Sequence, residues 1–154
     1  MIKILTPKCF GVTELINFNY MKPTQIEHIG IAVENLEESI SFYEHILGLK
    51  CYAIEEVKDQ QVRTAFFKIG EVKIELLEST DHEGPIGKFV AKKGPGLHHI
   101  AFAVKNTNNA LEEINTEGVR LIDKQSRKGA EGLDIGFIHP KSTGGVLIEL
   151  CNKA

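Results

Sequence analysis

Hydrophobic and polar positions follow the same order in two separate parts of the chain. Residues 26–48, IEHIGIAVENLEESISFYEHILG, alternate apolar and polar side chains and then change to the spacing of an amphipathic helix. Residues 97–118, LHHIAFAVKNTNNALEEINTEG, repeat this change, and aligning His28 with His99 gives an offset of 99 − 28 = 71. A repeated order of this length predicts two structurally related modules.

Each module is predicted to contain a strand, a helix and three further strands. The helices are expected at about Leu36–Leu47 and about Thr107–Glu117, and Gly48 and Gly118 are expected to end them. The later strands are expected at CYAIEEV, VRTAFFKI and VKIELLE in the first module and at VRLID, DIGFIH and GVLIELC in the second. The order βαβββ therefore occurs twice, and the predicted class is α+β.

Side chains of neighbouring strand residues point to opposite faces of a sheet, so the sequence indicates which residues share a face. In the first strand Ile29, Ile31 and Val33 share the face under the helix, whereas His28 shares the other face with small residues. His99 has the same surroundings in the second module. Each histidine is therefore expected to lie in an open concavity of the kind that holds ligands.

The last strands of the two modules carry the second pair of polar residues. KIELLES aligns with LIELCNK, which pairs Glu75 with Glu149 at an offset of 149 − 75 = 74. Both glutamates lie opposite bulky apolar neighbours in the alternating pattern. We therefore expect His28, Glu75, His99 and Glu149 to line one cleft.

Two imidazoles and two carboxylates from separate strands suit a borderline divalent metal such as Zn, Co, Ni, Mn or Fe. A single strand histidine is more commonly a hydrogen-bonded structural residue, and an exposed glutamate at a strand end is common. Repetition favours the metal, because four buried polar side chains without partners would be costly. By alternation His98 falls on the helix side of its strand, where a structural or supporting role is expected.

Composition narrows the classes of partner and location. A net charge of −3 provides no basic field for nucleic acid. No run reaches the roughly 18 apolar residues of a membrane helix, and the first twenty residues are not expected to act as an export signal. Cys9, Cys51 and Cys151 are widely spaced and odd in number, which fits reduced thiols and a cytoplasmic protein.

The domain organisation follows from where the repeat begins. Residues 1–24 precede the first convincing strand and are expected to be an N-terminal extension. Residues 25–154 are expected to form a single domain, with module one at about 25–93 and module two at about 94–154.

The chain resembles the vicinal oxygen chelate superfamily, and within it the methylmalonyl-CoA epimerases more closely than the glyoxalase I lyases. The resemblance covers residues 25–152 and rests on the stretch beginning at Ile26 together with KIELLES, GPGLHHIAFAV and HPKSTGGVLIEL. The last motif is the most specific, because glyoxalase I usually has a shorter turn before its final strand. The resemblance implies paired βαβββ modules that form a cupped mixed sheet, and usually a homodimer.

The resemblance also implies an activity. The expected reaction is metal-dependent interconversion of (2R)- and (2S)-methylmalonyl-CoA, by α-proton abstraction through a metal-stabilised enolate. The metal ligands carry over onto His28, His99 and Glu149, with Glu75 at a fourth position where the family accepts Gln or Glu. Glu149 is the expected catalytic base and Glu75 the other candidate. The expected ion is Co²⁺, and Zn²⁺, Ni²⁺, Mn²⁺ and Mg²⁺ are alternatives.

Two features keep other functions open. Thr64 stands where some epimerases carry a glutamate proposed as a second base, and threonine is no general base, so the second base stays unassigned. Two histidines and two glutamates are also the ligand set of glyoxalase I, so a lactoylglutathione lyase and a non-catalytic small-molecule-binding member are the alternatives. An iron dioxygenase is disfavoured, because a fourth ligand at Glu75 would fill the position that oxygen needs.

Overall fold

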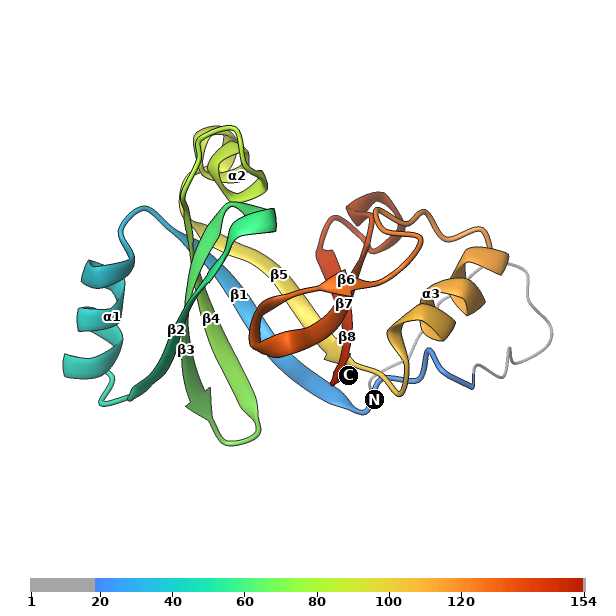
Figure 1. Ribbon diagram of the computed structural model, residues 1–154, viewed down its shortest axis with the longest axis horizontal. Helices are drawn as coiled ribbons and strands as arrows, with labels where there is room; N and C mark the ends of the chain where they lie inside the picture. The colour runs from blue at the N-terminus through green and yellow to red at the C-terminus, as the bar shows by residue number, and fades with distance from the viewer. Residues whose placement is uncertain (1–18, 154) are drawn as a thin grey trace, which may run out of the picture.

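The computed structural model describes residues 19–153 and shows two βαβββ modules in one sheet of eight strands (Figure 1). Module one consists of β1 (Gln25–Val33), α1 (Leu36–His45), β2 (Cys51–Val57), β3 (Val62–Ile69) and β4 (Val72–Ser79). Module two consists of β5 (Gly96–Ala103), α3 (Thr107–Thr116), β6 (Arg127–Lys128), β7 (Leu133–Ile138) and β8 (Leu147–Lys153). Helix α2 (Pro85–Lys93) joins them, and the short 3₁₀ turns are η1 (Lys58–Gln60), η2 (Ala130–Gly132) and η3 (Pro140–Ser142).

The strand order explains how two modules make one sheet. The order is β2-β3-β4-β1-β5-β8-β7-β6, with β1 parallel to β4, β5 parallel to β8, and β1 antiparallel to β5. Each module is therefore a four-stranded half, and the two halves meet where the first strands pair. The predicted α+β class and the cupped, mixed sheet are confirmed.

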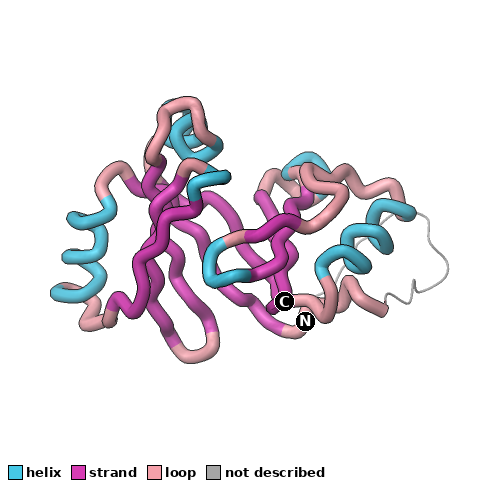
Figure 2. Tube along the Cα trace, in the orientation of Figure 1, coloured by secondary structure: helices cyan, strands magenta, loops and turns pink. Residues whose placement is uncertain are grey.

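Helices α1 and α3 lie at opposite ends of the molecule, each over the half-sheet of its own module (Figure 2). Asn35 caps α1 by accepting a hydrogen bond from the backbone N–H of Glu38, and Asn106 caps α3 by accepting one from Asn109. Gly48 follows α1 with a φ of 66°, in the left-handed region that favours glycine. The helices end one or two residues earlier than predicted.

One predicted strand is wrong. Residues 119–123, VRLID, form an isolated bridge between Leu121 and Ile138 and no ladder, so the additional strand of module two is the two-residue β6. The side chain of Asp123 accepts the backbone N–H of Phe137 at 2.9 Å, which takes the place of a backbone partner. Residues 119–123, predicted as a strand, are therefore an irregular segment beside β7.

The remaining predictions concern the chain's start and its thiols. Residues 1–18 of the expected extension, with Cys9, lie outside the described residues. The backbone N–H groups of residues 19–21 donate to the carboxylate of Glu113 on α3. Cys51 and Cys151 are free. Within residues 19–153, none of the helices has the length and apolar content needed to cross a membrane.

Candidate metal centre and active site

Four neighbouring strands each place one ionisable side chain at the middle of the sheet. All four residues predicted to line one cleft come together there: His28 on β1, Glu75 on β4, His99 on β5 and Glu149 on β8. Each has an exposed fraction of 6% or less. Burial of four such groups is costly unless they bind one another or a ligand. We call these four residues the His/Glu cluster.

Small residues on the two central strands make room for this cluster. Gly30 on β1 pairs with Glu75 on one side and with His99 on the other. Ala101 on β5 has the equivalent place, because it pairs with His28 on one side and with Glu149 on the other. The arrangement follows the prediction that each histidine shares its face with small side chains.

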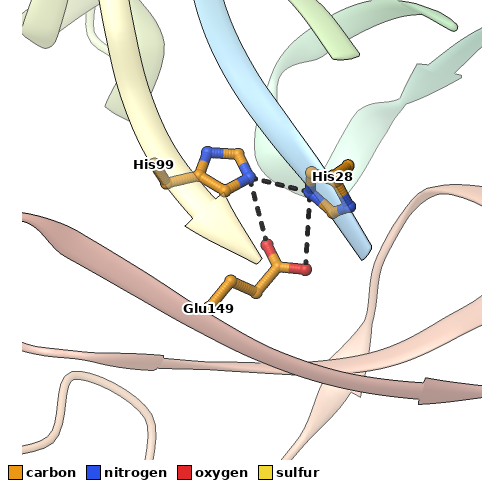
Figure 3. Close-up of side chains that lie close together, drawn as sticks. All are labelled: His28, His99 and Glu149. Atoms are coloured by element: carbon orange, nitrogen blue, oxygen red, sulfur yellow. Dashed lines mark hydrogen bonds and ion pairs between the residues drawn. The ribbon is translucent and has the colours of Figure 1, made fainter. Parts of the chain in front are cut away.

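The side chains of the cluster converge on one point. Nε2 of His28 lies 2.9 Å from Nε2 of His99 (Figure 3). Oε2 of Glu75 lies 3.3 Å from Nε2 of His28 and 3.6 Å from Nε2 of His99. Glu149 approaches from β8, with Oε2 3.5 Å from Nε2 of His99 and Oε1 3.8 Å from Nε2 of His28. Both imidazoles therefore direct Nε2 toward both carboxylates.

Hydrogen bonds behind the imidazoles decide how the rings are turned. Nδ1–H of His28 donates to Oε2 of Glu27 at 2.5 Å. Nδ1 of His99 lies 2.9 Å from Nδ1 of His98, and the neutral rings satisfy this contact when His99 donates its Nδ1–H. Each ring is thus held through Nδ1, and its Nε2 faces the cluster.

The pKa values of the two histidines move in opposite directions. Burial lowers the pKa of His28, but the hydrogen bond to Glu27 and the charges of Glu75 and Glu149 outweigh burial and raise it to about 9. Burial and the neighbouring positive charge of His28 hold the pKa of His99 well below its usual range. At neutral pH His28 therefore carries a proton on Nε2 and donates it to His99.

The carboxylates of the cluster are also perturbed. Burial raises the pKa of Glu75, and it raises the pKa of Glu149 to about 8, where the charge of His28 opposes the rise. Oε1 of Glu149 has no hydrogen-bond partner. Among the buried side-chain atoms of residues 19–153, the hydroxyl of Thr64 is the other one without a partner. A buried oxygen without a donor favours a bound cation or ligand.

The cluster fits a divalent metal ion. Donor atoms of His28, His99 and Glu149 all lie within 4.8 Å of one another, and Glu75 contacts both histidines. Imidazole nitrogen and carboxylate oxygen are the ligands that Zn²⁺, Co²⁺ and related ions take in proteins. A cation would replace the proton on Nε2 of His28 and would provide the partner that Oε1 of Glu149 lacks.

A cleft of about 190 Å³ opens beside the cluster. Much of its wall is apolar, and Phe66 on β3 and Phe137 on β7 pair in register with the two glutamates. Thr64 is also part of the wall, 1% exposed, and its hydroxyl is unpaired. Arg127 lines the cleft as well. An apolar cleft with a few convergent polar groups is typical of a small-molecule site.

Two bulges change the surroundings of the cluster from those predicted. The β1–β5 register shifts twice, and the extra residues are Glu27 and His98. His98 lines the cleft and packs edge-on against Phe89 of α2, so its predicted place on the helix side was wrong. Glu27 was missed for the same reason, because strict alternation directs it away from His28. A carboxylate directly before a candidate histidine ligand was the available signal.

The comparisons with known proteins agree with this geometry. The profile described as glyoxalase/bleomycin resistance protein/dioxygenase superfamily matches residues 27–137 of the chain. The chain belongs to this superfamily. It is the superfamily also called vicinal oxygen chelate, so the resemblance found in the sequence is confirmed.

Individual relatives within the superfamily cover most of the chain. The uncharacterized protein YqjC of Bacillus subtilis is 46% identical over 127 residues, which span 82% of this chain and 91% of that protein. The human mitochondrial methylmalonyl-CoA epimerase is 35% identical over 127 residues, spanning 82% of this chain and 72% of that protein. A variant of the Streptomyces coelicolor methylmalonyl-CoA epimerase, solved with 2-nitronate-propionyl-CoA, is 37% identical with a TM-score of 0.83, covering 86% of this chain and 96% of that chain.

Proposed function

We propose that this protein is a metal-dependent epimerase that interconverts (2R)- and (2S)-methylmalonyl-CoA. The observation that carries the proposal is the buried His/Glu cluster with an unpartnered carboxylate oxygen beside an apolar cleft. Its support comes from superfamily relatives named methylmalonyl-CoA epimerase, which are 33–37% identical over more than four fifths of the chain. The substrate is accordingly proposed to be an acyl-CoA thioester.

His28, Glu75, His99 and Glu149 are the residues proposed to hold the ion, for which we propose Co²⁺. A divalent cation bound there supplies Lewis-acid stabilisation of the negative charge that develops on carbonyl oxygens, which is worth several kcal/mol. Glu27 and His98 accept the Nδ1 protons of the two histidines and so keep each Nε2 directed toward the centre.

Glu149 is proposed as the catalytic base. The reaction breaks the Cα–H bond between two carbonyl groups, transfers its proton to Glu149 and leaves its electron pair in the enolate. A second acid, which stays unassigned, then supplies the proton of the new Cα–H bond on the opposite face. The carboxylate of Glu149 has two oxygens, and Oε1 has no hydrogen-bond partner, so one oxygen is available for the cation while the other takes the proton. In the metal-free protein burial raises the pKa of this carboxyl to about 8, above that of a solvated glutamate.

The cleft supplies the remaining features of the proposed reaction. Phe66 and Phe137 exclude water beside the two carboxylates, so that the charge moves in an apolar surrounding. Thr64 offers an unpaired hydroxyl from the wall and is proposed to hydrogen-bond the substrate rather than to move its α-proton. Glu75, the other carboxylate of the cluster, is the alternative base.

The proposal is tested by proton exchange. (2R)-Methylmalonyl-CoA is incubated in D₂O with Co²⁺-loaded protein, and loss of the α-proton signal is followed by NMR against a metal-free control. Exchange that depends on the metal, followed by appearance of the (2S) isomer, supports the epimerase. No exchange with protein that verifiably contains the metal overturns it.

A glyoxalase I-type lactoylglutathione lyase is the second candidate, because Glu75 completes a set of two histidines and two glutamates. The same metal-loaded protein would be assayed with the hemithioacetal of methylglyoxal and glutathione, and turnover of this substrate without exchange of methylmalonyl-CoA would favour the lyase. A homodimer and a cytoplasmic location stay predictions from the sequence.

A further inference from the structure

A second group of charged side chains lies behind the His/Glu cluster. Glu27 is 8% exposed, and its carboxylate accepts Nδ1–H of His28 with one oxygen and forms an ion pair with Lys73 through the other. Nζ of Lys73 also donates to Oε2 of Glu131 at 2.5 Å. We call this group the Glu27–Lys73–Glu131 network. It begins at a proposed metal ligand and ends in the other module.

Glu131 is held firmly at the far end of the network. It lies in η2, before β7, and its Oε1 accepts the hydroxyl of Tyr52 at 3.0 Å. Its backbone N–H donates to Oε2 of Glu55 at 2.9 Å, so β2 of module one holds both its side chain and its backbone. The φ of Glu131 is 53°, an uncommon value for a residue other than glycine. The contacts with Tyr52, Glu55 and Lys73 keep Glu131 in this conformation.

We propose that Glu27 is a positioning residue for the metal centre, and that Lys73 and Glu131 hold it in place from β4 and from module two. The inference rests on the proposed function, in which His28 is a metal ligand. A histidine that binds a metal through Nε2 carries its proton on Nδ1. A carboxylate that accepts this proton fixes the tautomer and the ring orientation and makes Nε2 a better ligand.

Lys73 is needed because Glu27 is buried. One oxygen of the Glu27 carboxylate contacts His28, and Lys73 neutralises the other. The side chain of Lys73 is itself only 16% exposed, and Glu131 provides its second carboxylate. Removing Glu131 leaves Lys73 with one partner and Glu27 less firmly oriented. Because Glu131 also lines the cleft, the wall of the cleft and the orientation of His28 are coupled.

The second module lacks this support. His98 occupies the place equivalent to Glu27, at 98 − 27 = 71, and contacts Nδ1 of His99 as a neutral ring. A neutral acceptor forms a weaker hydrogen bond than a carboxylate does. The Glu27 side of the metal centre is therefore the better supported side, and its loss is expected to be measurable in metal affinity.

The experiment compares Glu27→Gln, Glu131→Gln and the double variant with wild-type protein. Lys128→Met serves as the matched control, because Lys128 forms an ion pair with Asp134 on the β6–β7 hairpin but takes no part in the network. Each protein is freed of metal, and its affinity for Co²⁺ is measured in competition with a chromophoric chelator. The visible absorption of bound Co²⁺ and the thermal unfolding of the metal-free protein are recorded in parallel.

Glu27→Gln is expected to weaken Co²⁺ binding by about 10- to 100-fold and to change the Co²⁺ absorption spectrum. Glu131→Gln is expected to weaken binding less. The double variant should bind as Glu27→Gln does, because Glu131 acts through Glu27 and the losses are then not additive. Lys128→Met should bind as wild type. A merely structural role would lower the unfolding temperature and leave affinity and spectrum unchanged.

The outcomes separate this inference from the function on which it rests. Wild-type protein that takes up no Co²⁺ overturns the proposed metal site itself. Wild-type protein that binds Co²⁺, together with a Glu27→Gln variant of equal affinity and spectrum, overturns the positioning role. Fully additive losses in the double variant overturn the action of Glu131 through Glu27. If Glu27→Gln does not fold, wild-type affinity in Glu131→Gln overturns the network.

Discussion

The ring of His99 lies directly against the backbone of Gly30 on the neighbouring strand. A Cβ atom on Gly30 would come within 2.2 Å of Cε1 of His99, so a side chain at this position is incompatible with the observed ring. Glycine is therefore required here by the close approach of a proposed ligand.

Gly30→Ala is expected to displace His99 and to lower the free energy of unfolding by about 1–3 kcal/mol, the usual cost of overpacking. Metal retention should be lost with it. Gly136→Ala is the control for overpacking away from the site. Its Cβ would meet Cδ1 of Leu111 at 2.6 Å in the core under α3, so this variant should lose stability and keep its metal. Chemical denaturation and metal analysis of both variants check the prediction, and a Gly30→Ala protein with wild-type metal content would contradict it.

His99→Ala removes one proposed ligand outright. We expect the variant to lose both metal retention and α-proton exchange. Metal affinity and exchange rate should each fall by more than about 100-fold, which is the upper end of the loss caused by removing a supporting residue. His45→Ala is the matched control, since His45 is exposed on α1. Elemental analysis after dialysis and NMR exchange rates measure the two effects. Wild-type exchange in His99→Ala would show that the site has been assigned wrongly.

The two carboxylates of the cluster are distinguished by amide substitution. Glu149→Gln should fold and should lose about 10²- to 10⁴-fold in α-proton exchange, because an amide does not accept the proton. Glu75→Gln should keep most of the exchange, because an amide oxygen still binds a metal. Exchange rates in D₂O decide between them: the reverse ranking would make Glu75 the base.

The metal-free protein is expected to become less stable as the pH rises from 6.5 to 9. The pKa of His28 is raised from 6.5 to about 9, and burial raises that of Glu149 from 4.5 to about 8. In this range the folded protein holds protons that the unfolded chain has released, so the free energy of unfolding falls with increasing pH. The pKa of His99 is lowered, so this residue slightly opposes the fall just above pH 6.5 and contributes almost no slope above about pH 7.5.

Denaturation in the presence of a chelator at pH 6.5 and at pH 9 measures this difference, and Glu149→Gln should reduce it. Metal affinity should change in the opposite sense, because a cation displaces these protons more easily at high pH. Equal or greater stability of the metal-free protein at pH 9 would contradict the assignment of the protons.

The spacing of apolar residues within single segments was enough to predict the regular strands and helices. Alternation and helical spacing placed the strands of module one, and the offset of 71 residues located both histidines. Residues 119–123 were misassigned, because an apolar run does not show whether a neighbouring strand has room to pair with it. Alternation also failed at Glu27 and His98, where one extra residue in a ladder reverses the face of a side chain.

Lys73 and Glu131, the outer members of the Glu27–Lys73–Glu131 network, had no local signal. Lys73 and Glu131 are 58 residues apart, and they meet because the turn before β7 reaches β2 of module one. Contacts of this kind depend on how a sheet curls, which the spacing of apolar residues in one segment does not specify. The predicted ligand set needed only a repeat, whereas its supporting residues needed the whole fold.

The repeat that builds the cluster is broken in the wall beside it. Thr64 on β3 and Ile135 on β7 hold equivalent places, at 135 − 64 = 71, and both line the cleft. A flat molecule held between the modules would meet a hydroxyl without a partner on one side and a hydrocarbon branch on the other. The cluster is nearly the same from both halves, so this pair of residues makes the two walls of the cleft chemically different although the frame that carries them is duplicated.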